Sequence, residues 1–80
     1  LRLAASRAFR SWIDAAAAHL RRAGVEQGVA EDLAALFVAT IEGSFVLSRA
    51  LRSGEPLIAA GRYVGRLAQE AIEEAAIIRR

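Results

Sequence analysis

The sequence has 80 residues, 55% of them apolar, with one histidine and no cysteine. The length allows one domain at most, and the lack of cysteine excludes disulfides and cysteine metal sites. All eleven basic residues are arginines, the net charge is only +2, and the arginines are interleaved with acids. Nucleic-acid binding by this segment is therefore not expected. A chain this short and apolar, without disulfides, is expected to oligomerise.

The first predicted helix runs from about Leu3 to Ala23, because its apolar residues recur at steps of three and four. They form one face: Phe9, Trp12, Ile13, Ala16, Leu20 and Ala23. Gly24 follows directly and suits a left-handed C-terminal cap.

A short connection, residues 25–29, precedes the second predicted helix, which starts near Val29 or Ala30 and continues to about Arg52. Glu31 and Asp32 would lie in its first turn, where negative charge is favourable. Ser53-Gly54 is predicted to end it.

Glu55-Pro56 opens the third predicted helix, since proline suits the first helical position, and the helix runs to about Ile77. Strict alternation of apolar and polar residues is absent, so no strand is predicted. Short connections make successive helices antiparallel. The predicted fold is all-α, with three antiparallel helices in an up-down-up arrangement.

The second helix is apolar on more than one side, and two further helices cannot easily cover all of it. One side carries small residues, and glycine inside a helix costs about 1 kcal/mol relative to alanine, so the glycines need a packing reason. A two-fold dimer with a four-helix interface would supply it; the alternative is packing within one chain. The predicted interface comprises Ala35, Ala39, Gly43, Val46, Leu47, Ala50, Leu57, Gly61, Val64, Gly65 and Ala68.

Candidate ligand residues gather on the first two helices: Phe9, Trp12, Ile13, Phe37, Ile41, Glu42 and Phe45. They either fill the joint between these helices or line an apolar pocket there. Glu42 is expected to pair with Arg49 or Arg62 of either chain, or to anchor a ligand. His19 is expected to be a solvated residue near a helix end.

No motif for catalysis is present, so no enzyme activity, cofactor or metal is expected. The apolar run from Leu33 to Leu47 is shorter than the ~20 residues that span a bilayer, and it contains Glu42. No membrane partner is therefore expected. The sequence contains no methionine, which favours a piece of a longer chain.

The chain resembles the C-terminal domain of TetR-family transcriptional regulators, most closely the YxaF/LmrA-like subgroup. The resemblance covers Phe9 to about Leu67 and lies in the order and spacing of weak, largely apolar motifs. These motifs are Phe9 with Trp12-Ile13, Gly24-Val25, Leu33-Ala34, Ile41-Glu42-Gly43, Leu47-Ser48-Arg49-Ala50 and Glu55-Pro56-Leu57.

The resemblance implies a cytoplasmic bacterial repressor that forms a homodimer through a four-helix bundle. The bundle helices would be residues 30–52 and 56–77. It also implies a small, apolar effector and binding of operator DNA through an N-terminal helix-turn-helix, which these 80 residues lack. The alternative is a structural dimerisation module without a ligand.

Overall fold

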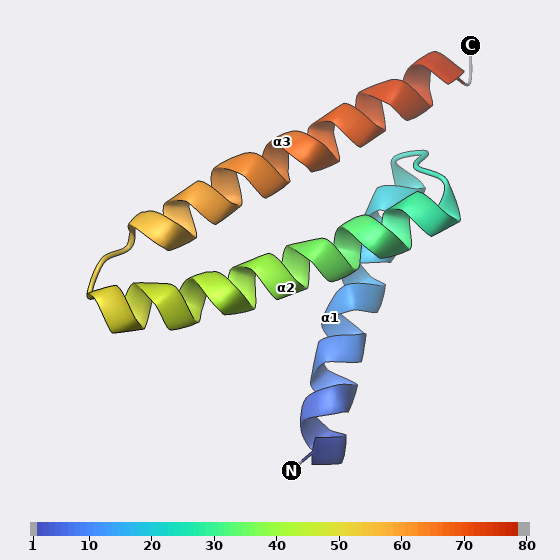
Figure 1. Ribbon diagram of the computed structural model, residues 1–80. Helices are drawn as coiled ribbons and strands as arrows, with labels where there is room; N and C mark the ends of the chain where they lie inside the picture. The colour runs from blue at the N-terminus through green and yellow to red at the C-terminus, as the bar shows by residue number, and fades with distance from the viewer. Residues whose placement is uncertain (1, 79–80) are drawn as a thin grey trace.

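The computed structural model describes residues 2–78, which form three helices and, within that range, no strand (Figure 1). Helix α1 spans Arg2–Arg22, α2 spans Gln27–Leu51 and α3 spans Glu55–Ile78. The predicted all-α class with three helices is confirmed. The observed helix ends lie within three residues of the predicted ones.

The helices form a thin body rather than a compact one. Helices α2 and α3 lie antiparallel, as predicted, whereas α1 crosses α2 steeply (Figure 1). The predicted up-down-up arrangement of three antiparallel helices is therefore wrong for α1. The radius of gyration is 14.2 Å, against about 12 Å for a compact domain of this length. The shortest extent is 13 Å, little more than the diameter of one helix. Much of each helix therefore has no covering layer on one side.

The turn after α1 is a glycine cap, as predicted. Gly24 has φ 101°, a backbone conformation that glycine adopts without a Cβ clash. The Gly24 N–H donates to the Arg21 carbonyl at 2.9 Å, and the Val25 N–H donates to the Leu20 carbonyl at 3.1 Å. These bonds satisfy the last carbonyls of α1 and turn the chain back toward α2.

Helix α2 begins at Gln27, earlier than the predicted Val29 or Ala30, because Glu26 caps it. The Glu26 carboxylate accepts hydrogen bonds from the Gly28 N–H at 2.9 Å and the Val29 N–H at 3.1 Å. Two N–H groups that lack helical partners are thereby satisfied. With this start, Glu31 and Asp32 lie beyond the first turn, which holds no acidic residue; their predicted place in that turn is wrong.

The turn from α2 to α3 begins at an arginine, one residue before the Ser53-Gly54 pair that was predicted to end α2. Arg52 adopts the left-handed conformation, with φ 50° and ψ 47°, and the Ser53 N–H donates to the Ser48 carbonyl at 3.0 Å. Gly54 is not in the left-handed region. The Ser53 Oγ accepts from the Glu55 N–H at 3.2 Å, which fixes the start of α3.

The core lies where the C-terminal half of α1 meets the start of α2 and the C-terminal half of α3. Its buried members are Ala17, Leu20, Val25, Ala30 and Ala34, with Ala68, Ala71, Ile72 and Ala75 of α3 packed against them. Among residues 2–78 no large side chain is fully enclosed. A core made mainly of alanines buries little apolar area, so one chain has limited hydrophobic stabilisation.

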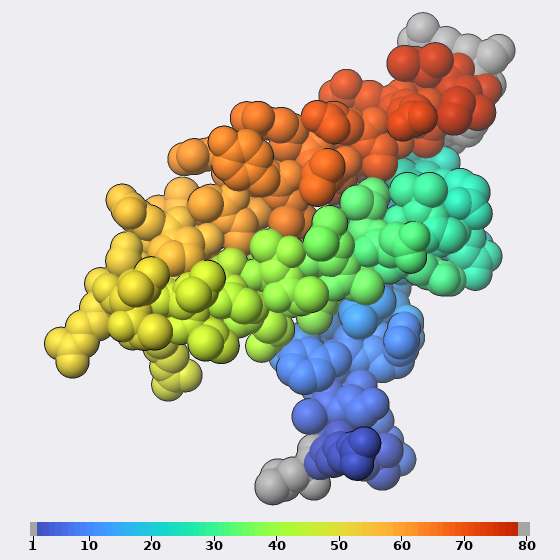
Figure 2. Space-filling view, viewed as in Figure 1, coloured from blue at the N-terminus to red at the C-terminus, as the bar shows by residue number. Residues whose placement is uncertain are grey.

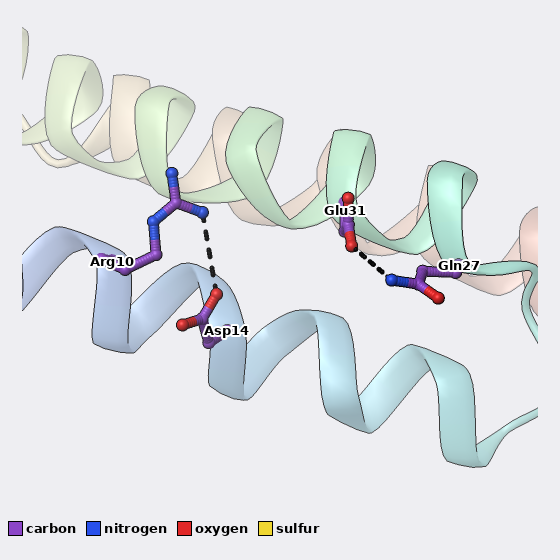
Figure 3. Close-up of polar contacts among 4 residues, drawn as sticks. All are labelled: Arg10, Asp14, Gln27 and Glu31. Carbon is purple, nitrogen blue, oxygen red and sulfur yellow. Dashed lines mark hydrogen bonds and ion pairs between the residues drawn. The ribbon is translucent and has the colours of Figure 1, made fainter.

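Polar contacts between side chains stay within single helices. Arg10 and Asp14 form an ion pair at 3.7 Å on α1, and the Gln27 amide donates to Glu31 at 3.0 Å on α2 (Figure 3). Both pairs have the i, i+4 spacing, and such exposed pairs stabilise a helix only weakly. The helices are therefore held together by apolar packing.

Candidate functional site

One side of α2 is apolar and uncovered, and we call it the open α2 face. It consists of the six α2 residues predicted for a dimer interface, all exposed in the single chain: Ala35, Ala39, Gly43, Val46, Leu47 and Ala50. Val46 is 67% exposed and Leu47 is 53% exposed. A Cβ added at Gly43 would meet nothing within 4 Å. Packing within the chain therefore does not explain Gly43.

The five α3 residues predicted for the same interface are placed differently. Val64 is buried by its own chain, with 8% of its surface exposed, so it has little area left for a second copy. Gly61, Gly65 and Ala68 lie with Val64 along a cavity that faces α1 and α2, and Leu57 is half-buried. Gly61 and Gly65 remain exposed in the single chain, and the place of these five residues at a dimer interface stays a prediction.

A cavity of about 260 Å³ lies between the three helices, and we call it the three-helix cavity. Side chains of α1, α2 and α3 all contribute to its wall. Its lining consists of Ala16, His19, Leu20, Leu33, Ala34, Phe37, Gly61, Val64, Gly65 and Ala68. His19 is the one polar side chain in that list. Apolar pockets with few polar groups, placed between the helices of a bundle, are typical small-molecule sites.

The predicted ligand residues do not gather around this cavity. Phe37 is the one of the seven that lines it. Phe9 and Trp12 are 39% and 51% exposed, and their rings meet edge to face with centroids 5.3 Å apart. Phe45 is exposed as well, while Ile13, Ile41 and Glu42 are half-buried. The aromatic side chains were expected at the joint of α1 and α2, but α1 crosses α2 too steeply for its N-terminal half to reach that helix.

Glu42 is half-buried on α2. Within residues 2–78 of one chain, the ion pair Arg10–Asp14 is the one salt bridge, so Glu42 contacts neither Arg49 nor Arg62 in that way. Its expected pairing with those arginines of the same chain is not observed. A pairing across two chains stays a prediction.

Sequence reasoning placed His19 in solvent and missed its position at the cavity. His19 is largely exposed, yet it also lines the three-helix cavity with Ala16 and Leu20. Those two residues lie three positions before and one position after it, on the inner side of α1. Helical spacing alone could have predicted this position of His19, because its neighbours Ala16 and Leu20 were already assigned to the apolar face.

Chemistry for catalysis is not gathered anywhere in the described range. No group of three or more histidine, aspartate or glutamate residues within 2–78 could hold a metal ion. A lowered pKa is found at Glu26, where the hydrogen bonds from the Gly28 and Val29 N–H groups stabilise the carboxylate. That residue caps α2 and does not line the three-helix cavity.

Helix α2 is long and apolar enough to cross a membrane, judged by length and composition alone. The expectation against a span rested on the shorter run from Leu33 to Leu47, whereas α2 has 25 residues. Its mean hydropathy over the most apolar window is 1.5. The core helices of soluble proteins pass the same test. Length and composition therefore do not decide whether lipid or protein covers α2.

Comparison with known proteins yields one match. The model of a family described as the C-terminal domain of LmrA/YxaF-like transcriptional regulators matches residues 1–63. The matched range takes in all of α1 and α2 and the first part of α3. No match was found among curated proteins or among solved structures.

Proposed function

The chain belongs to the C-terminal domain family of the TetR-type, LmrA/YxaF-like transcriptional regulators, and from this premise we propose that it mediates homodimerisation and small-ligand sensing in a repressor. The domain is part of a transcription regulator, in a family that is regulatory rather than enzymatic. We place the intact repressor in the bacterial cytoplasm. Its operator DNA would be bound by a helix-turn-helix outside these 80 residues.

The observation that carries the dimerisation proposal is the open α2 face. Six neighbouring α2 residues, including Val46 and Leu47, expose apolar or small side chains along one side. A monomeric soluble protein rarely leaves a large apolar patch in water. A second copy related by a two-fold axis would cover this face with the same face of its own α2. Helices α2 and α3 of both copies would then form a four-helix bundle.

The open α2 face also fits close contact between helices. Ala35, Ala39 and Gly43 are spaced by four, so they line up along the helix. The space outside Gly43 is empty in the single chain, which leaves room for the backbone or a side chain of the partner helix.

Ligand sensing is supported by the three-helix cavity, because residues of all three helices line it. A ligand controls DNA binding only if it favours one arrangement of the domains over another. A molecule bound between α1 and α3 would contact both helices, and would thus favour one distance between them. The alternative function, a structural dimerisation module without a ligand, is favoured by the scattered positions of Phe9, Trp12 and Phe45.

Sedimentation equilibrium of the 80-residue chain over a dilution series tests the dimerisation proposal. A mass of twice 8.6 kDa that persists to low micromolar concentration is expected. A well-folded monomer at all concentrations would contradict it, because the open α2 face would then be stable in water. Flotation with lipid vesicles would separate the remaining possibility, since a membrane helix floats with lipid and a dimer does not.

A further inference from the structure

We propose that one side of α3 binds the same side of α3 in a second copy of the chain, with the two helices antiparallel. We call it the outer α3 face. The inference goes beyond the proposed function, because this side is separate from the open α2 face. A chain that uses both faces would form assemblies larger than a dimer. The outer α3 face consists of six residues, all exposed in the single chain: Ala59, Tyr63, Arg66, Glu70, Glu73 and Ile77.

The outer α3 face is one continuous side of the helix. Its residues are separated by four, three, four, three and four positions, which is the spacing of a coiled-coil seam. The buried residues of α3, Ala60 and Val64, lie on another side, which packs within the chain. None of the six residues lines the three-helix cavity, and α3 lies at an edge of the molecule (Figure 1). A second helix can therefore reach the outer α3 face without displacing α1 or α2.

The charges at the centre of the outer α3 face complement themselves when a second α3 runs in the opposite direction. Arg66 and Glu70 lie two positions on either side of Ala68. A two-fold axis that passes beside Ala68 therefore brings each Arg66 opposite the Glu70 of the second copy. Neither side chain forms a salt bridge within residues 2–78 of one chain. A parallel pair of helices would instead place like charges beside each other, so the charges select the antiparallel arrangement.

The flanking residues fit the same two-fold axis. Tyr63 and Glu73 lie five positions on either side of it. The Tyr63 hydroxyl would thus donate a hydrogen bond to the Glu73 carboxylate of the second copy. Ala59 and Ile77 lie nine positions on either side of the axis. The Ile77 side chain, which is 69% exposed in the single chain, would then pack against the small Ala59 of the second copy.

The stability of α3 alone does not explain the order of its charges. Arg62 and Arg66 are four positions apart, and so are Glu70 and Glu74. Like charges at this spacing repel each other on a helix. The Arg66 guanidinium lies 5.1 Å from the centroid of the Tyr63 ring, on the outer α3 face and not over a carboxylate. A second α3 in the reverse direction would place acids opposite the arginines and arginines opposite the acids.

The test uses the 80-residue chain with Val46→Glu, which removes association through the open α2 face. Sedimentation equilibrium up to millimolar concentration should still detect dimers of this variant, and they should weaken as salt is raised. Adding Arg66→Glu should raise the dissociation constant at least about tenfold, because each central contact then places two carboxylates opposite each other. Glu70→Arg should do the same with two guanidinium groups. A Val46→Glu chain that stays monomeric throughout would overturn the proposal.

Mixing the two charge variants separates a contact between chains from one within a helix. The Arg66→Glu and Glu70→Arg chains should associate with each other at least as tightly as the Val46→Glu chain does with itself. In the mixed pair every contact between positions 66 and 70 again joins opposite charges. These positions are also four apart in one helix, but loss of a pair within the helix would not be repaired by mixing. No recovery in the mixture would therefore refute the outer α3 face.

A control and the parent chain complete the test. Arg7→Glu, at an exposed position of α1, makes the same change of net charge and should leave association unchanged. Circular dichroism should be the same in all variants, because the substituted residues are exposed. In the chain without Val46→Glu the two faces fail separately. If Arg66→Glu leaves all association unchanged while Val46→Glu abolishes it, the open α2 face stands and the outer α3 face is refuted.

Discussion

The two halves of α2 differ in what covers them, although both are apolar. In the first half, Ala30 and Ala34 are almost completely enclosed, with 0% and 1% of their surface exposed. In the second half, Val46 and Leu47 are more than half exposed. The first half has α1 on one side and α3 on the other, whereas the second half has α3 alone (Figure 2).

The difference shows that hydrophobicity alone does not decide which residues are buried within one chain. Small alanines are buried where three helices meet, and larger residues stay exposed where only two helices meet. A helix in a two-helix layer always keeps one side in water. The second half of α2 is therefore the part of the molecule that most needs a further partner.

Leu20→Ala is expected to have the largest effect, because it truncates the largest buried side chain in the core where the three helices meet. Truncating a buried leucine lowers the free energy of unfolding by about 2–5 kcal/mol, enough to unfold a small domain. Urea unfolding at fixed protein concentration measures the change. Leu3→Ala, at a residue 62% exposed, is the control and should change stability by less than about 0.5 kcal/mol. Equal effects in the two variants would contradict the position of the core.

Val46→Glu tests the second half of α2, which only α3 covers. A carboxylate in the centre of an apolar interface would be buried without a partner, so the dimer should dissociate at least about 100-fold more readily. Sedimentation equilibrium measures the dissociation constant. Leu3→Glu places the same charge at another exposed apolar residue and should leave association unchanged. A dimer unaffected by Val46→Glu would exclude the open α2 face from the interface.

Arg52→Gly should stabilise the turn between α2 and α3. A residue with a side chain pays about 1–2 kcal/mol in the left-handed conformation, and Arg52 has φ 50°. Replacement by glycine should raise the free energy of unfolding by about 1 kcal/mol. The same replacement inside the last turn of α2, Arg49→Gly, should lower it by about 1 kcal/mol. Thermal melts of both variants give the comparison, and a loss of stability in both would refute the argument.

The smallest effect is expected from Glu26→Gln, which changes the cap at the start of α2. Hydrogen bonds from two backbone N–H groups lower the pKa of Glu26 from its ordinary value in the folded chain. Its stabilising effect is therefore present above the unfolded-state pKa and is lost as the pH falls through the folded-state pKa. Glu26→Gln should melt a few degrees below the parent at pH 7, and the difference should shrink below pH 4. A difference that does not depend on pH would mean that the charge of the cap does not matter.

The sequence predicted the fold well because its strongest signals are local. Helical periodicity, Gly24 and Pro56 marked three helices and two turns, and the structure has them all. The ends of α2 were less predictable. Glutamate is not among the preferred capping residues, so Glu26 gave no recognisable signal. Arg52 adopts the left-handed conformation, which is uncommon for a residue with a side chain.

The candidate site was less predictable than the fold, because it depends on the angles between helices. Spacing placed Val46 and Leu47 on one side of α2, but it could not reveal that Gly61 and Gly65, though exposed, border the three-helix cavity. Spacing also assigned Trp12 and Leu20 to one face of α1. Because α1 crosses α2 steeply, only the C-terminal part of that face, with Leu20, becomes buried.

The crossing of α1 has a mechanical consequence. Its buried residues, Ala17 and Leu20, lie in the C-terminal half, and its N-terminal half projects from the rest of the molecule (Figure 2). Arg2 lies about 22 Å along the axis from Ala17, at 1.5 Å per residue. A tilt of only about 10° around Ala17 would thus move the far end of α1 by about 4 Å. A small tilt of α1 about its buried C-terminal part, beside the three-helix cavity, would therefore displace its N-terminal part by several times more than the residues near Ala17.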